Sequence, residues 1–136
     1  VTIEEKEWVD LGLPSGILWD NKNENGYYTC DEAIDIYGKS LPTKEQFEEL
    51  FKLSHKWNNK HRGVEFIGNN GNKLFLPAEG VCFRTDFSDV GEYGYYCSTP
   101  PPGRTCSFRF LFGPSYQKYD RIGNNYSMSV RLIKNI

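Results

Sequence analysis

The sequence has little of what nucleic acids, membranes and metal ions require of a protein. Its 136 residues carry 16 Lys and Arg against 18 Asp and Glu, and no basic stripe offers itself to a phosphate backbone. No apolar run approaches the ~20 residues of a membrane-spanning helix. The two histidines, His55 and His61, are interpreted as surface residues rather than metal ligands. We therefore expect no nucleic-acid partner, no membrane insertion by this segment, and no metal or other cofactor.

Signatures of catalysis are missing as well. The chain has no Gly-rich phosphate loop, no Ser-His-Asp set and no His-rich metal motif. Glu45, Glu48 and Glu49 are interpreted as the solvated face of a helix, because nothing nearby supplies a partner for catalytic carboxylates. The sequence therefore predicts no enzyme activity.

Four cysteines leave two disulfide states open. No pair has the CxxC spacing of a zinc or thioredoxin-type site. Cys97 and Cys106 flank a proline-rich loop, and a disulfide between them would stabilise the fold by roughly 2–3 kcal/mol. Four buried free thiols, with Cys30 and Cys82 as the other two, are the alternative.

Length and composition predict a single domain over residues 1–136. Hydrophobic residues make up 38% of the chain and aromatic residues 15%, so Tyr and Phe contribute much of the expected core. Val1 opens the sequence without a signal peptide, and we expect that a targeting segment has been removed.

The most informative stretch covers residues 91–112 and combines aromatic alternation with prolines. Residues 107–112 (SFRFLF) place three Phe on one face of a strand and Ser, Arg and Leu on the other. Pro100, Pro101 and Pro102 cannot join a sheet ladder, so they connect this strand to the tyrosine-rich strand before it. We expect a core hairpin whose outward face, together with the segment that follows it, forms a binding surface; a core hairpin with a stiff loop and no binding role is the alternative.

Two capping boxes predict two short helices. Thr29 and Glu32 begin the first helix, which continues through Ile36 and ends at Gly38. Residues 43–46 (TKEQ) begin the second. Helical spacing places on one side of this second helix Phe47, Leu50, Phe51 and Leu53.

Apolar alternation and turn residues predict the strands. Residues 64–67 and 73–76 flank the turn residues Asn70 and Gly71 in the clearest hairpin of the sequence. The other expected elements are strands over residues 7–13, 17–19 and 128–133 and a long loop over residues 78–90. We expect the strands at the two chain ends to pair with each other.

Five motifs, in this order, resemble the Fibrobacter succinogenes major paralogous domain family. They are residues 8–16 (WVDLGLPSG), 41–50 (LPTKEQFEEL), 75–80 (FLPAEG), 94–99 (GYYCST) and 129–131 (SVR). The resemblance implies an α+β, C-type-lectin-like fold with two short helices, mainly antiparallel strands, and paired N- and C-terminal strands. The calcium motifs of sugar-binding C-type lectins are absent, so calcium-dependent sugar binding is not implied.

The family is common in secreted and surface proteins of gut Bacteroidetes, and it is similar to the variable proteins of bacterial and phage diversity-generating retroelements. The resemblance therefore implies an extracellular, cell-surface or virion location and a binding module for a protein or glycan ligand on a cell surface. Two alternatives stay open: an oxidoreductase resembling the formylglycine-generating enzyme, with Cys97 and Cys106 as its cysteine pair, and a structural subunit of a surface or fimbrial assembly.

Retroelement variable proteins diversify positions near the C terminus, and the resemblance transfers that role to a set of residues here. The candidate ligand-binding residues are Arg104, Arg109, Leu111, Tyr116, Lys118, Tyr119, Asp120, Arg121 and Tyr126. Tyrosines with polar neighbours are typical of protein recognition surfaces. We expect Tyr116, Tyr119 and Tyr126 to be partly exposed and to share one face with Arg104 and Arg109.

Overall fold

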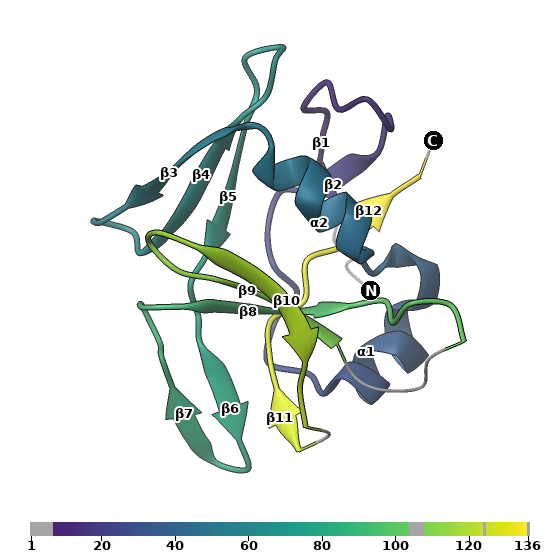
Figure 1. Cartoon of the computed structure of the whole chain (residues 1–136), viewed down its shortest axis with the longest axis vertical. Coiled ribbons are helices and arrows are strands. Elements are labelled where there is room, and N and C mark those ends of the chain that lie inside the picture. Colours follow the sequence, from purple (N-terminus) through teal and green to yellow (C-terminus); the bar gives the residue numbers. More distant parts are fainter. Residues whose placement is uncertain (1–6, 104–107, 124, 136) are drawn as a thin grey trace, which may run out of the picture.

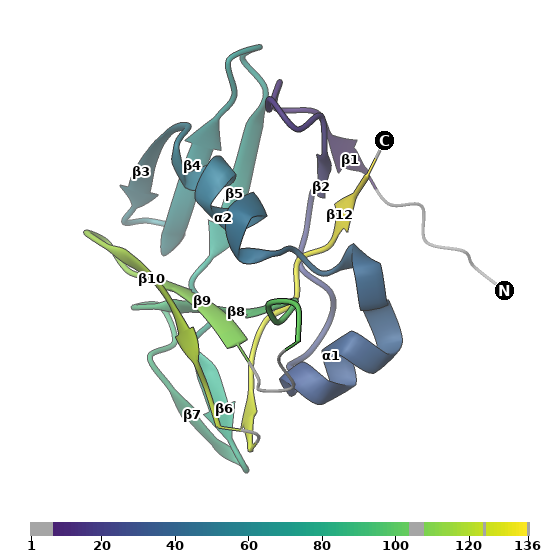
Figure 2. The same cartoon turned by 45° about the vertical axis from the view of Figure 1, so that its right-hand side comes forward.

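The computed structural model describes residues 7–103, 108–123 and 125–135. The described chain forms four three-stranded antiparallel sheets, two α-helices and a short 3₁₀-helix. In Figures 1 and 2 the hairpin of residues 63–77 projects at one end of the molecule and the hairpin of residues 81–88 at the other. The sheet that contains residues 94–98 and 108–112 crosses between them. The fold is mostly β, and it is not clearly the α+β, C-type-lectin-like fold that the family resemblance implies, so that prediction is wrong.

The excess of strands comes from polar segments without apolar alternation. Strands β3 (Ser54–Asn58), β7 (Asp86–Ser88) and β10 (Gln117–Arg121) each lie at the edge of a sheet. Edge strands meet water along one side, so they need no continuous apolar face. The predicted loop over residues 78–90 is accordingly wrong, because β6 (Val81–Phe83) pairs with β7 in a hairpin.

The two chain ends lie in one sheet but do not pair with each other. Strands β1 (Trp8–Val9) and β12 (Ile133–Lys134) both pair with β2 (Leu18–Asp20), which lies between them. The predicted direct pairing is therefore wrong. Strand β1 is short because the chain turns at Gly12, whose φ is +69° and whose amide donates to the Asp10 carboxylate.

The hairpin around Asn70 and Gly71 is confirmed. Strands β4 (Gly63–Ile67) and β5 (Lys73–Pro77) pair antiparallel, and Gly71 has a φ of +88° at the turn. Strand β3 completes this sheet on the far side of β4. His55 on β3 and His61 in the following turn are both exposed, as expected of surface histidines.

Both predicted helices are confirmed. A complete capping box begins both helix α1 (Cys30–Tyr37) and helix α2 (Lys44–Phe51). In each box the threonine side chain accepts a hydrogen bond from the amide of the third helical residue, and the side chain of that residue accepts one from the threonine amide. The 3₁₀-helix η1 (Gly38–Ser40) follows α1 directly.

Helix α2 packs its apolar side on the central sheet and contributes to the largest core cluster. That sheet has the order β10-β9-β8, with β8 (Gly94–Ser98) and β9 (Phe108–Phe112) paired as the sequence predicts. The Phe47 ring stacks on Phe110 with centroids 4.7 Å apart, and Phe51 also packs on Phe110. The apolar side of α2 therefore fixes the helix over β9.

A second core cluster contains two cysteines. Cys97 on β8 is fully buried and has a free thiol, which interacts with the side chain of Cys30 at the start of α1. This hydrogen bond and burial raise the pKa of the Cys97 thiol well above its usual value. The structure therefore does not bear out a disulfide between Cys97 and Cys106, and Cys106 itself lies outside the described residues. The alternative of buried thiols, not joined in a disulfide, holds for the three described cysteines, Cys30, Cys82 and Cys97.

Cys97 is expected to resist alkylation in the folded, reduced protein. Its raised pKa keeps the thiol protonated at neutral pH, and the thiolate is the nucleophile. Iodoacetamide at pH 7.5, followed by peptide mass spectrometry, should leave Cys97 unmodified in buffer and fully modified in urea. Modification in buffer at the rate of an unfolded peptide would contradict the burial of this thiol.

Among the described residues, no helix is long and apolar enough to cross a membrane. The same part of the chain contains no group of three or more His, Cys, Asp or Glu side chains placed to hold a metal ion.

Candidate functional site

Strand β10 carries most of the predicted site residues, and its register divides them between two faces. Tyr119 lies opposite Phe110, whereas Lys118 lies opposite Leu111 and Asp120 opposite Arg109. Because side chains alternate along a strand, Tyr119 faces α2 and Arg109 faces the other side of the sheet. The prediction that these two residues share one face is therefore wrong.

Tyr119 is held in one orientation on the α2 side. Its ring stacks on Phe108 at 5.3 Å, and Lys44 Nζ lies 5.7 Å from the ring centroid. The hydroxyl donates to the carbonyl of Thr99 at 3.3 Å. Burial raises the pKa of Tyr119, so the hydroxyl stays a donor at neutral pH. Since the Tyr119 side chain is partly buried and its ring packs on Phe108, Tyr119→Ala would disturb packing as well as any ligand contact.

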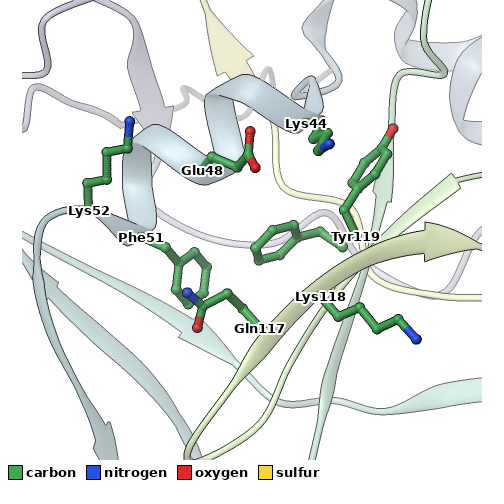
Figure 3. A pocket seen from close by; sticks show the side chains of 8 residues that line it. Lys44, Glu48, Phe51, Lys52, Gln117, Lys118 and Tyr119 are labelled. Atoms are coloured by element: carbon green, nitrogen blue, oxygen red, sulfur yellow. The ribbon is translucent and has the colours of Figure 1, made fainter.

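A groove of about 480 Å³ runs between α2 and β10. Figure 3 shows Lys44, Glu48 and Lys52 along the α2 wall. The groove's other lining residues, from the helix and the sheet, are Phe51, Phe110, Gln117, Lys118 and Tyr119. We call this space the α2–β10 groove. It has aromatic side chains between its walls and charged or amide groups along its rim.

A second hollow, of about 350 Å³, adjoins the groove. Tyr119 and Lys44 line both spaces. The rest of its lining consists of Thr43, Glu45, Thr99, Pro100, Pro101 and Pro102. We call it the proline hollow. The two spaces together offer a polar groove that continues into a proline-lined depression.

The opposite face of β10 is flatter and more self-contained. The guanidinium of Arg109 lies over the Tyr95 ring at 5.3 Å, and Leu111 is buried. Lys118 Nζ and Asp120 Oδ2 are 3.2 Å apart. The Arg121 amide and then Lys118 hold the pKa of Asp120 below its usual value. The charges on this face are partly neutralised by one another.

The other two predicted tyrosines lie apart from the groove. Tyr116 is 45% exposed and packs edge-on against Tyr93, and Tyr126 is half-buried against Phe83. The prediction that the three tyrosines are partly exposed is confirmed, although they occupy three separate places. Arg104 lies outside the described residues.

Of the eight predicted residues that the structure describes, only Lys118 and Tyr119 line the α2–β10 groove, and the Lys118 ammonium lies beside Asp120 on the other face of β10. The helix wall was not predicted from the sequence, where Glu48 is interpreted as one of several solvated carboxylates. A signal was present: Lys44, Glu48 and Lys52 recur every four residues and therefore follow one side of a helix. Only the fold shows that this side borders β10.

Comparison with protein-family models, with curated proteins and with solved structures finds no match for this chain.

Proposed function

We propose that this protein is a binding module that holds a protein ligand in the α2–β10 groove. The observation that supports the proposal is an edge strand with exposed recognition side chains beside a groove of about 480 Å³. Pockets of this size are large enough to take several ligand side chains. The groove also combines an aromatic anchor, Tyr119, with adjustable Lys and Gln side chains, as protein recognition surfaces do.

Rigid walls favour binding at this place. Helix α2 is fixed by buried Phe47, Leu50 and Phe51, and β10 pairs with β9 along its full length. A groove between two such elements needs little ordering when a ligand enters, which lowers the entropic cost of association. An extracellular or cell-surface location and diversification by a retroelement stay predictions of the family resemblance.

The groove can be filled to test the proposal. A displayed library of random 12-residue peptides would be selected on the unmodified protein, and the enriched peptides measured by calorimetry. Gln117→Trp places a large side chain in the groove from an exposed strand position and should weaken binding at least tenfold. Lys73→Trp, exposed on β5 outside the groove, is the matched control and should change binding by less than twofold.

The melting temperature of both variants would be measured as a control. We expect both to stay folded, because exposed substitutions of this kind change stability by only about 0.5 kcal/mol. Equal affinity of the Gln117→Trp variant and the unmodified protein for every enriched peptide would place the binding surface elsewhere. Enrichment of no peptide together with specific capture of immobilised oligosaccharides would favour a glycan ligand.

A further inference from the structure

The open edge of β10 supplies a second kind of binding group beside the groove. On the far side of the central sheet, β8 is bridged by the chain near Ser129, through the bond from the Cys97 amide to the Ser129 carbonyl. Strand β10, at the opposite edge, pairs only with β9 among the described residues. Main-chain groups along a free edge can pair with an added strand whatever its sequence.

The charges around the α2–β10 groove favour an acidic occupant. Two lysines of α2, Lys44 and Lys52, line it with one carboxylate, that of Glu48. The third lining lysine, Lys118, has its Nζ 3.2 Å from Asp120 Oδ2, so its charge is largely offset within the protein. The neighbouring Glu49 is turned elsewhere, since its carboxylate accepts from the Ser15 hydroxyl and amide. A locally positive groove in a chain whose formal net charge is −2 is complementary to acidic side chains.

The shape of the groove and of the proline hollow also favours some ligand side chains over others. Phe51 and Phe110 lie between the charged walls, and the hollow adds three prolines beside the Tyr119 ring. An extended strand places every second side chain on the same face, at intervals of about 6.6–6.8 Å. One such face could therefore set acidic groups near the lysines and an apolar group in the hollow.

We infer that the ligand is an extended acidic peptide that adds a strand to β10 and directs alternate side chains into the α2–β10 groove. This inference rests on the proposed function and specifies its ligand. The added strand would derive affinity from backbone hydrogen bonds and selectivity from the lysines and the proline hollow.

The inference is tested with the peptides enriched from the 12-residue library. We expect a net negative charge in the enriched sequences. Lys44→Glu combined with Lys52→Glu should weaken their binding at least tenfold, whereas Lys73→Glu, outside the groove, should change it less than twofold. Weakening by added salt should be lost in the double variant, because the screened charges are gone.

Backbone pairing is tested separately by N-methylation of single amides in one enriched peptide. Strand addition predicts an alternating result, with at least tenfold loss at every second position and little change between them, because alternate amides point at β10. Tolerance of N-methylation at all positions, or enrichment of neutral or basic peptides, would overturn the inference. So would enrichment of no peptide at all.

These outcomes separate the inference from the proposed function. If Gln117→Trp abolishes binding of neutral peptides, or of peptides that tolerate N-methylation throughout, the groove is the binding site but its ligand is not an acidic strand. If Gln117→Trp leaves all binding unchanged, the proposed function itself fails.

Discussion

Replacing Arg131 with Met is expected to lower the free energy of unfolding by about 3–5 kcal/mol. Arg131 is only 2% exposed, and each guanidinium nitrogen has an acceptor. Nε donates to Asn23 Oδ1 at 2.7 Å, Nη1 to the Asp20 carbonyl at 2.9 Å, and Nη2 to the Phe75 carbonyl at 2.8 Å. Methionine fills similar space but leaves these acceptors without their donor and the buried Asp20 without its nearby cation.

The Arg131 prediction is checked by urea denaturation, with two companion variants. Arg131→Lys keeps the charge but loses the planar three-point geometry, so its loss should be intermediate. Arg121→Met removes an exposed arginine from β10 and should change stability by no more than about 0.5 kcal/mol. Equal stability of Arg131→Met and the unmodified protein would mean that the three bonds contribute little to the fold.

Arg131 also illustrates what the sequence could not predict. The strand pattern correctly places Met128, Val130 and Leu132 in the core, where all three are buried. The same pattern gives no reason to bury Arg131, and the strand expected over residues 128–133 is reduced to β12 at Ile133–Lys134. The structure buries Arg131, because the carbonyls that bind it come from β2 and β5, and only the folded chain brings these elements together.

Local signals predicted elements where short-range chemistry decides them. Both helices begin at capping boxes that need only four consecutive residues, and the β4–β5 turn needs only Asn70 and Gly71. Strand β10 had no such signal, because residues 117–121 are polar and become a strand by pairing with β9. The predicted pairing of the two terminal strands was wrong for a related reason. Strand β2 lies between β1 and β12 and pairs with both, and no local pattern in the sequence indicates that order.

For the candidate site, too, the sequence predicted some of the residues but not how the fold arranges them. Lys118 and Tyr119 were identified from residue type alone, as polar and aromatic neighbours near the C terminus. Their separation from Arg109 depends on the register between β9 and β10, and a shift of one residue would reverse it. The α2 wall depends on how the helix packs over β9, which no spacing within residues 44–52 reveals.

The packing of α2 over β9 depends on Phe47, and we expect Phe47→Ala to loosen the helix and to lower the free energy of unfolding. Phe47 is fully buried between Trp19, Tyr96 and Phe110, with ring centroids 5.5, 6.4 and 4.7 Å away. Removing the ring leaves a cavity in the largest core cluster, and changes of this kind cost about 3–5 kcal/mol. Urea denaturation should show this loss, because little else replaces the stacked contact with Phe110.

The same substitution connects stability to the groove. Helix α2 forms one wall of the α2–β10 groove, so a loosened helix should weaken the binding of library-selected peptides even where the protein remains folded. Phe47→Leu retains most of the apolar contact and should lose only about 1–2 kcal/mol. Phe87→Ala, at a ring that is 58% exposed on β7, should lose less than about 1 kcal/mol and leave binding intact. If Phe47→Ala and Phe87→Ala proved equally stable, Phe47 would not anchor α2. The groove would then depend on contacts other than the stack with Phe110.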